Sequence, residues 1–542
     1  MNRLTLGEMV DRAAARHSDA TALVFDGRRF SFSDFHAAVE RAARGFLAQG
    51  IRKGEPVVLW MSNGPAWLHA FFGLQKVGAV VIPVNTRFRS VDLEYVLRQS
   101  DATTLIVRDR SGSADLLDVV RALLPELDGP PARPFARFAQ LRRVILSGSV
   151  HVPPGARGWD SVLEDGEAVS AEALRTRQAS VRPEDCAVIL YTSGTTGAPK
   201  GAMHSHAMVR TVFDGANRLG ITPRDAILLY LPLFHSMGLY LGGLLFLASG
   251  ARLVLMERFD AGESLALIER ERVTFMPGFD THFFDMLEHP RFAQTDRLTL
   301  RFAMLPAGAA GVEPIARRTN AAFCPTVSGY GSSECGTGIA LTFLDAALEE
   351  RCLGSGYPMP GYEFQTRDPD GGRPNAPGVA GELYVRGYGV MLGYYGKPEE
   401  TARALDAEGW FRTGDMAVID AYGFLRYLGR YKDMLKVGGE NLDPTEVEGF
   451  LEAHPAIAQV KVVGVPHRRL GEAPVACVVP RAGAGLTVEE LRDWCHGRIA
   501  SFKIPLAVVT VESFPMTSTG KVQRGALREA IVAQLEGRPG SN

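Results

Sequence analysis

Apolar and polar positions follow two different periods along the first part of the chain. From Phe32 to Leu47, apolar residues recur at spacings of three and four, the period of a helix that buries one face. Pro56 to Trp60 is an unbroken apolar run, typical of a strand that is covered on both faces. Segments of these two kinds alternate over the first ~180 residues, and this alternation predicts an α/β fold.

One apolar stretch is long enough to be tested as a membrane span. Ala226 to Ala251 contains no Asp, Glu, Lys or Arg and exceeds the ~18 residues of a membrane-spanning helix. A proline, a histidine and several glycines interrupt it, at Pro232, His235, Gly238, Gly242 and Gly243. Such interruptions are typical of loops. We therefore expect a buried strand, a loop and a helix in this stretch.

The length of the chain and a change of pattern near residue 430 indicate two units. A chain of 542 residues exceeds what a single hydrophobic core supports. After Gly429–Asp433, the remaining ~110 residues have their own helical pattern at Glu446–Ala453 and strand pattern at Val460–Val465. The sequence predicts a large, multi-subdomain N-terminal body over residues 1–431 and a small, mobile α+β C-terminal lid domain over residues 432–542.

Charge and cysteine content exclude several classes of function. Lys and Arg number 59 against 61 Asp and Glu, which leaves a net charge of −2. The chain thus has no global basic field for nucleic acid, and any phosphate chemistry has to be local. The six cysteines form no CxxC pair, which fits reduced thiols rather than a metal–thiolate site. Acidic residues interrupt the start of the chain where a signal peptide would be apolar, so we expect a cytoplasmic protein.

A glycine- and hydroxyl-rich loop follows the apolar strand pattern of Cys186–Leu190. It reads Tyr191-Thr-Ser-Gly-Thr-Thr-Gly-Ala-Pro-Lys-Gly201, and we expect a helix from His204 onward. Glycines let the backbone approach an anion closely, hydroxyls donate to phosphate oxygens, and a lysine supplies positive charge. The Walker A pattern ends in Gly-Lys-Ser/Thr, whereas Pro199 and Gly201 flank Lys200 here, so a P-loop NTPase is disfavoured.

The segment Ser193–Gly201 resembles the signature of adenylate-forming (AMP-binding) enzymes, which include acyl- and aryl-CoA synthetases, firefly-type luciferases and nonribosomal-peptide adenylation domains. Further matches follow in the family's order, at Leu231–Gly238, Pro306–Ala310, Tyr330–Glu334, Gly381–Leu383, Gly393–Tyr395, Trp410–Asp415, Gly429–Asn441 and Pro515–Lys521. Lysine is scarce, and five of the nine lysines lie inside these motifs: Lys200, Lys432, Lys436, Lys503 and Lys521. The resemblance covers nearly the whole chain.

The resemblance implies an acyl-CoA synthetase that works in two steps. A carboxylate attacks the α-phosphate of ATP, pyrophosphate leaves, and the thiol of coenzyme A then displaces AMP from the acyl-adenylate. The expected cofactors are therefore ATP, Mg²⁺ and coenzyme A. The catalytic residues that the match implies are Lys521, Glu334 and His235. Lys521 would bridge the carboxylate and the α-phosphate, and Glu334 with Thr195 would bind the metal.

The same match implies the nucleotide and coenzyme A sites. Asp415 corresponds to the acid that accepts both ribose hydroxyls on a rigid turn, and adenine would lie flat between Gly308–Ala310 and Tyr330. The implied ATP-binding residues are Thr192, Ser193, Gly194, Thr195, Thr196, Gly197, Lys200, Gly308, Ala309, Ala310, Tyr330, Gly331, Ser333, Asp415, Arg430 and Lys521. The implied coenzyme A residues are Lys436, Gly438, Gly439, Phe502 and Lys503, and Lys432 is the hinge of the lid.

The acyl pocket is expected to be uncharged. Its residues are expected to be His235, Ser236, Met237, Gly238, Gly278, Met304 and Ser332. Because a second carboxylate or an ammonium buried there without a partner would cost several kcal/mol, an apolar monocarboxylate is expected. Gly238, Gly242, Gly243 and Gly278 would leave room for a chain or an aliphatic ring. We expect a medium- to long-chain fatty acid, with alicyclic or aryl acids as the alternative.

Three rival functions are weighed against an acyl-CoA synthetase. Amino-acid adenylating enzymes usually carry an aspartate at the position of His235, and a luciferase-like oxygenase would not depend on coenzyme A. A catalytically dead nucleotide sensor would have lost Lys521, Glu334 or Asp415, and all three are present. The expected partners are a small carboxylic acid, ATP and coenzyme A, with no nucleic acid. Peripheral membrane contact and a homodimer are left open.

Overall fold

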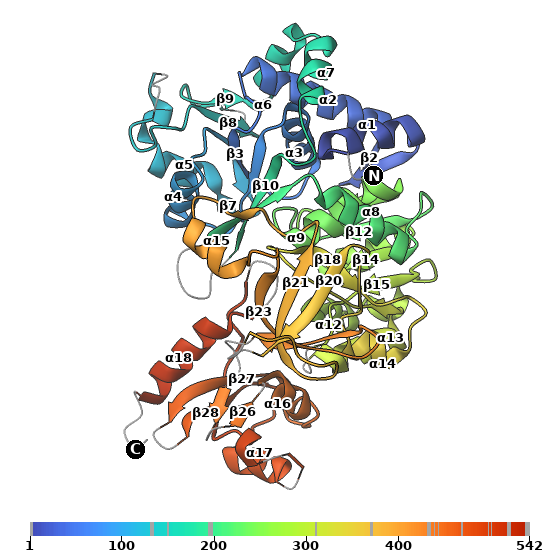
Figure 1. Cartoon of the computed structure of the whole chain (residues 1–542), viewed down its shortest axis with the longest axis vertical. Coiled ribbons are helices and arrows are strands. Elements are labelled where there is room, and N and C mark those ends of the chain that lie inside the picture. Colours follow the sequence, from blue (N-terminus) through green and yellow to red (C-terminus); the bar gives the residue numbers. More distant parts are fainter. Residues whose placement is uncertain are drawn as a thin grey trace.

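The computed structural model describes residues 4–130, 135–148, 151–192, 199–308, 312–368, 372–430, 435–437, 440–442, 444–467, 470–496, 498–499, 501–517 and 522–536. In Figure 1 the chain runs from its N-terminal part at the top to its C-terminal part at the bottom. Several sheets carry helices on their faces. The predicted α/β fold, with a large N-terminal part and a small C-terminal domain, is confirmed.

The first sheet of the body has eight strands in the order β22-β11-β10-β4-β3-β5-β8-β9. Its strands are β22 (Gly393–Tyr394), β11 (Lys200–Ser205), β10 (Cys186–Thr192), β4 (Val80–Pro83), β3 (Pro56–Trp60), β5 (Thr104–Arg108), β8 (Arg143–Ser147) and β9 (Arg157–Gly158). From β10 to β9 neighbouring strands are parallel, whereas β11 runs antiparallel to both β10 and β22. A small hairpin, β6 (Arg110–Ser111) and β7 (Ala114–Asp115), lies beside it.

The N-terminal third of the chain supplies the helices that lie around this sheet and beside the next one. They are α1 (Leu6–His17), α2 (Phe32–Ala48), α3 (Pro65–Val77), α4 (Ser90–Gln99), α5 (Leu116–Leu123), α6 (Trp159–Asp165) and α7 (Ala171–Ala179). The predicted helix is confirmed as α2, which starts in a capping box: the Asp34 N–H donates to the Ser31 hydroxyl, and the Asp34 carboxylate accepts the Ser31 N–H. The predicted strand is confirmed as β3.

The second sheet has seven strands in the order β16-β15-β14-β12-β13-β1-β2. They are β16 (Thr326–Val327), β15 (Phe302–Met304), β14 (Phe275–Pro277), β12 (Ala226–Leu229), β13 (Arg252–Leu255), β1 (Thr21–Phe25) and β2 (Arg28–Ser31), and only β2 is antiparallel to its neighbour. Its helices are α8 (Met208–Leu219), α11 (Ala261–Arg270), α12 (Asp280–Glu288), α13 (Glu313–Ala322) and α14 (Leu348–Leu353).

The uncharged stretch from residue 226 to 251 belongs to this second unit. It forms β12, a loop, the short helix α9 (Ser236–Gly238), the π-helix η3 (Leu239–Leu244) and α10 (Leu245–Ser249). The prediction of strand, loop and helix is confirmed. Among the described residues, no helix combines the length and the apolar character needed to cross a membrane.

Two antiparallel sheets follow in the chain. The first contains β17 (Gly329–Ser332), β18 (Gly336–Leu341) and β19 (Tyr357–Pro358). The second contains β20 (Tyr362–Arg367), β21 (Gly381–Gly387), β23 (Phe411–Ile419) and β24 (Leu425–Arg430). Helix α15 (Pro398–Ala404) leads from β22 of the first sheet toward β23. These segments connect the two large sheets to the C-terminal domain (Figure 1).

The C-terminal domain has its own sheet and hydrophobic core. Its strands are β25 (Leu435–Val437), β26 (Glu440–Leu442), β27 (Ile457–His467), β28 (Gly471–Pro480) and β29 (Ala507–Thr510), and its helices are α16 (Pro444–Leu451), α17 (Val488–Cys495) and α18 (Arg524–Glu536). The predicted helix and strand are confirmed as α16 and β27. Val447 and Leu451 of α16 pack with Val460 and Val462 of β27 in its core. The predicted boundary at residues 431 and 432 lies outside the described residues.

Candidate active site

The predicted phosphate loop joins two strands instead of a strand and a helix. Thr192 at the end of β10 pairs with Lys200 at the start of β11 in antiparallel register. The helix expected from His204 is therefore wrong, because His204 lies inside β11 and α8 begins only at Met208. β11 is paired on both sides, with β10 and β22, and this pairing fixes it as a strand. The loop residues Ser193, Gly194, Thr195, Thr196 and Gly197 lie outside the described residues.

Lys200 is connected to the predicted metal ligand through Tyr394, which is not among the predicted site residues. Its ammonium forms an ion pair with Glu400 of α15 and lies 5.1 Å from the centroid of the Tyr394 ring. The Tyr394 hydroxyl in turn donates to Oε1 of Glu334 at 3.2 Å. Lys200 thus lies over the ring of Tyr394, and Glu334 lies at its hydroxyl. The sequence contains a sign of this role, because Tyr394 lies in the matched motif Gly393–Tyr395.

The backbone around Glu334 is fixed by several hydrogen bonds. Glu334 lies in the tight connection between β17 and β18, where Oγ of Ser332 accepts the N–H of Glu334 at 3.2 Å. The carbonyl of Glu334 accepts the Met391 N–H at 2.7 Å. His204 Nε2 lies 2.6 Å from the Ser333 carbonyl oxygen. Burial lowers the pKa of His204 to about 4, so the ring is neutral at pH 7 and its Nε2–H donates.

Asp415 lies in a strand and is held by two partners. It was expected on a rigid turn, but it lies inside β23, opposite Arg430 of β24. Arg430 Nε is 2.9 Å from Oδ1 of Asp415, and the Tyr330 hydroxyl donates to Oδ2. The Asp415 side chain is only 4% exposed. The charge of Asp415 raises the pKa of Arg430, and burial raises the pKa of Tyr330, so this site holds a charged guanidinium and a neutral phenol.

Gly308 occupies a position that only glycine can fill. Its φ is +115°, and a Cβ there would lie 2.9 Å from the Ser355 hydroxyl oxygen and 3.2 Å from the Tyr427 carbonyl oxygen. The Tyr427 ring lies 6.1 Å from the Tyr330 ring, centroid to centroid. The structure thus brings Gly308 and Tyr330 to the same place, close to Asp415. Ala309 and Ala310 lie outside the described residues, and the stacking of adenine on Tyr330 stays a prediction.

Gly331 and His235 have local structural roles next to the site. A Cβ at Gly331 would lie 2.4 Å from the Gly336 carbonyl oxygen, so the β17–β18 connection closes only with glycine there. Nδ1 of His235 accepts the Met237 N–H at 3.4 Å and caps α9, which contains Ser236, Met237 and Gly238. The catalytic role of His235 stays a prediction.

The glycines that were expected to leave room for the acyl group are already packed against the chain. A Cβ at Gly238 would lie 2.2 Å from the Pro232 carbonyl oxygen, and one at Gly278 would lie 2.6 Å from the Tyr230 hydroxyl oxygen. Gly242 and Gly243 are filled in the same way by leucine side chains. The expectation of open space at these four positions is wrong. Glycine here permits close packing and does not create a cavity.

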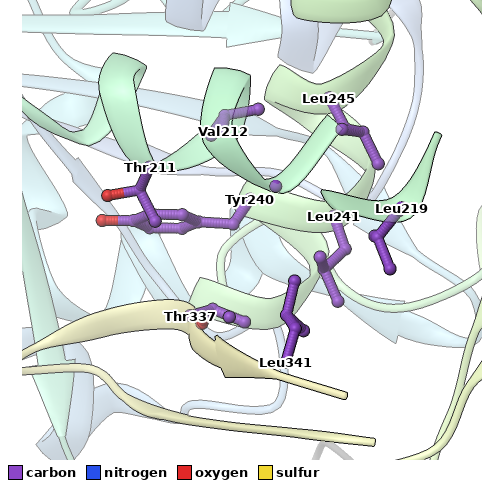
Figure 2. Close-up of a pocket in the computed structure, with 10 residues that line it drawn as sticks. Thr211, Val212, Leu219, Tyr240, Leu241, Leu245, Thr337 and Leu341 are labelled. Atoms are coloured by element: carbon purple, nitrogen blue, oxygen red, sulfur yellow. The ribbon is translucent and has the colours of Figure 1, made fainter. Parts of the chain in front are cut away.

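The structure contains a small apolar pocket at a different position, with a free volume of about 10 Å³. It is lined by Thr211, Val212, Gly215 and Leu219 of α8, by Tyr240, Leu241 and Leu245 of η3 and α10, and by Thr337, Gly338 and Leu341 of β18 (Figure 2). All ten side chains are uncharged, and β18 starts two residues after Glu334. None of these residues was among the predicted acyl set. The predicted Met304 is buried in β15 and contacts the position of Gly329.

The predicted coenzyme A residues lie in the C-terminal domain. Phe502 is half-buried against the core of that domain, and Lys503 Nζ lies 5.7 Å from its ring centroid. The side chain of Lys436 and the residues Gly438, Gly439, Lys432 and Lys521 lie outside what the structure describes. The segment that leads to Lys521 contacts the body, because Nη1 of Arg87 donates to the Thr517 carbonyl at 3.2 Å.

Comparison with known proteins places these motifs in one family. The family model "AMP-binding enzyme" matches residues 10–395, and the model "AMP-binding enzyme C-terminal domain" matches residues 446–521. The protein YngI of Bacillus subtilis is 34% identical over 536 residues, which cover 97% of each chain. Human ACSF2, named a medium-chain acyl-CoA ligase, is 33% identical over 553 residues, 99% of this chain and 89% of its own.

Solved structures agree with the sequence matches. The crystal structure of the anthranilate CoA ligase AuaEII in complex with anthranoyl-AMP superposes with a TM-score of 0.86 at 25% identity, over 99% of both chains. The matched residues include the strand that carries Lys200, the connection that carries Glu334 and the C-terminal motif that ends at Lys521. The chain therefore belongs to the AMP-binding enzyme family.

Proposed function

We propose that this chain, an AMP-forming acid–CoA ligase, takes a medium-chain fatty acid as its acyl substrate. The observation that carries the proposal is the small uncharged pocket between α8, η3, α10 and β18, which an acyl chain would widen as it enters. Leu219, Leu241, Leu245 and Leu341 line one side of it (Figure 2). Each methylene of a fatty acid that is buried among such side chains contributes about 0.8 kcal/mol. A charged second group on the substrate would lie there without a partner.

The position of the pocket relative to Glu334 supports an acyl role. β18 begins at Gly336, directly after Glu334 and Cys335, and its residues Thr337, Gly338 and Leu341 line the pocket. An acid whose carboxylate reaches Glu334 would therefore extend its chain along β18. The name of the ACSF2 relatives, medium-chain acyl-CoA ligase, supports the same length of chain.

For the nucleotide, we propose that Asp415 accepts the ribose hydroxyls and that Arg430 assists. Asp415 is fixed by Arg430 and by the Tyr330 hydroxyl, so its carboxylate needs no reorganisation when a ribose binds. Adenine would occupy the space beside Gly308 and Tyr330, where the backbone approaches closely. Lys200 and the loop residues 193–197 would contact the phosphates, with Ser333 and Thr192 at the rim.

For Mg²⁺, we propose Glu334 as the protein ligand, with Thr195 as a second oxygen donor. The carboxylate of Glu334 fits this role, since it is an oxygen ligand of the kind that a hard cation prefers and Tyr394 already orients its Oε1. When bound, the ion offsets the charge of the phosphates that repel the incoming carboxylate. Glu334 supplies one ligand and leaves the remaining positions to phosphate oxygens and water.

For the second step, we propose that the C-terminal domain turns about Lys432 and brings a different face to the adenylate. Lys521 would stabilise charge at the α-phosphate during adenylation, and Lys436, Gly438, Gly439, Phe502 and Lys503 would contact coenzyme A. The Arg87–Thr517 hydrogen bond lies four residues from Lys521, which supports a close approach of this part of the domain to the body.

An aryl acid is the second candidate. The solved structure of AuaEII contains an anthranoyl-AMP, so a neighbour with the same fold accepts an aromatic acid. The experiment that separates the candidates measures coenzyme A-dependent AMP release with acetate, butyrate, octanoate, laurate, cyclohexanecarboxylate and benzoate. We expect the highest kcat/KM for octanoate or laurate. A higher kcat/KM for acetate, cyclohexanecarboxylate or benzoate would contradict the fatty-acid proposal.

A further inference from the structure

Tyr240 carries a buried polar atom at the wall of the apolar pocket. Its side chain is 2% exposed, and its hydroxyl has no hydrogen-bond partner among the described residues. A buried hydroxyl without a partner destabilises the protein unless a ligand or water supplies one. Figure 2 shows this hydroxyl beside Thr211, whereas the four leucines lie on the other side of the pocket.

The neighbouring polar groups already have partners. The Thr211 hydroxyl bonds the Tyr362 hydroxyl at 3.0 Å, and the Tyr388 hydroxyl donates to Asp214 at 3.1 Å. The thiol of Cys335 lies 3.2 Å from the Ser332 hydroxyl. Within the described part of the chain, these groups bond to one another and none of them bonds to Tyr240. A polar group of a molecule in the pocket would supply the Tyr240 hydroxyl with a partner.

The backbone at Tyr240 supports a functional rather than an accidental placement. Tyr240 lies in the π-helix Leu239–Leu244, and π-helical turns occur frequently at functional sites. Its hydroxyl oxygen would lie 3.4 Å from a Cβ on Gly336, which follows Glu334 by two residues. The Tyr240 hydroxyl thus lies close to the segment that carries Glu334, and Figure 2 shows the four leucines farther from that hydroxyl.

We infer that Tyr240 is a specificity-determining residue that selects acids with an oxygen substituent close to the carboxyl group, such as 3-hydroxy fatty acids. This inference rests on the proposed function, since it takes the pocket as the acyl site. An acid whose carboxylate lies near Glu334 passes Tyr240 with its first carbons. A hydroxyl on carbon 3 gives Tyr240 its missing partner, while a hydroxyl near the far end of the chain would lie unpaired among leucines.

The test compares 3-hydroxyoctanoate, octanoate and 7-hydroxyoctanoate in the wild-type chain and in Tyr240→Phe. We expect wild-type kcat/KM to be about tenfold higher for 3-hydroxyoctanoate than for octanoate, and lowest for 7-hydroxyoctanoate. In Tyr240→Phe the ratio of kcat/KM for 3-hydroxyoctanoate to kcat/KM for octanoate should fall to about one. The matched control is Tyr230→Phe, since Tyr230 is also buried with an unpartnered hydroxyl but does not line the pocket, and it should keep the wild-type ratio.

Thermal unfolding gives a readout that does not depend on activity. Removal of a hydroxyl that the protein does not bond should leave the Tm of Tyr240→Phe equal to or above that of the wild type. A Tm lower by several degrees would mean that the protein itself holds the hydroxyl and would overturn the inference. A wild-type preference for octanoate, or an unchanged ratio in Tyr240→Phe, would also overturn it. If no fatty acid supports AMP release at all, the proposed function itself is wrong, and the inference about Tyr240 fails together with it.

Discussion

The nucleotide side and the acyl side of the site are built in different ways. Around Asp415 the carboxylate is held by two side chains: it forms an ion pair with Arg430 and accepts a hydrogen bond from the Tyr330 hydroxyl. Around Tyr240 the walls are leucines, glycines and threonines from three separate parts of the chain, and the tyrosine hydroxyl is unpaired within the described residues. The first region is organised before any ligand binds, and the second depends on its ligand for a partner. We expect mutations in the first region to affect all substrates and those in the second to affect only the choice of acid.

The largest effect is expected from Lys521→Ala, which tests the shared chemistry. If the ammonium acts only at the α-phosphate, the variant should lose adenylation by about 10³-fold or more. It should largely keep the transfer of a supplied acyl-adenylate to coenzyme A. Pyrophosphate release and thioester formation are measured separately, with Lys53→Ala as a lysine control in the body. Equal losses in the two half-reactions would contradict this role.

Asp415→Ala should raise the KM for ATP by about 100-fold, for every acid alike, because two charge-assisted hydrogen bonds to the ribose are lost. The matched control is Glu382→Ala, since Glu382 is a buried carboxylate of the same sheet that pairs with Arg412. Initial rates over a range of ATP concentrations check the prediction. A change in acid preference with an unchanged KM for ATP would mean that Asp415 acts on the choice of acid and not on ATP binding. That result would contradict the proposed difference between the two regions.

The contrast also explains how much could be predicted from the sequence. Asp415, Arg430, Glu334 and Tyr330 could be predicted as site residues because they lie in motifs that resemble those of the family, and the structure brings Asp415, Arg430 and Tyr330 into contact. The phosphate loop could be singled out as well, but its second side was predicted as a helix, because β11 becomes a strand through pairing with β10 and with β22, which is about 190 residues away. That partner is two residues long and gives almost no pattern of its own.

The acyl pocket could not be predicted in the same way. Its walls come from α8, from η3 and α10, and from β18, and apolar side chains carry no signature that distinguishes a pocket wall from core. Glycines were taken as a sign of open space, yet Gly238 and Gly278 are packed against the chain. Gly215, which the sequence did not single out, has nothing within 4 Å of its Cβ position. Tertiary packing alone decides whether a glycine leaves open space or lets the chain pack closely.

On the nucleotide side, His204 should make stability depend on pH. Its pKa is lowered from 6.5 to about 4 by burial, so the unfolded chain binds a proton at a pH where the folded chain does not. Its contribution to stability is complete above pH 6.5 and is lost as the pH falls toward 4, by about 3 kcal/mol in total. Denaturant midpoints between pH 7 and 4 should therefore fall less steeply in His204→Asn than in the wild type. The exposed His151 serves as the control, and an unchanged slope in His204→Asn would contradict the prediction.

On the acyl side, Gly215→Leu should shorten the preferred acid. Gly215 lies in α8 at the pocket wall, and a Cβ there would have no atom within 4 Å, so the leucine side chain would take up space in the pocket. We expect kcat/KM for octanoate to fall about tenfold while that for butyrate stays the same, since each excluded methylene loses about 0.8 kcal/mol. Gly525→Leu in α18 is the matched control, because it makes the same change at another open helical position. Equal losses on both acids would mean that the pocket does not hold the chain.

The smallest effect is expected from Tyr394→Phe. This variant tests whether the hydrogen bond from Tyr394 to Glu334 contributes to the organisation of the nucleotide side. The Tyr394 hydroxyl donates to Glu334 at 3.2 Å, and its ring lies beside Lys200. Phenylalanine keeps the ring and removes only the hydrogen bond that orients the carboxylate, so we expect a three- to tenfold loss, about 1 kcal/mol, in adenylation.

The loss should become smaller at high Mg²⁺ concentration, because Glu334 would then bind the ion in spite of its greater freedom. Tyr395→Phe removes the neighbouring hydroxyl, which donates to Asp101 away from Glu334, and should show no such dependence on Mg²⁺. If the two variants respond alike to Mg²⁺, Tyr394 does not act through the metal ligand, and the organisation of this region rests on Asp415 alone.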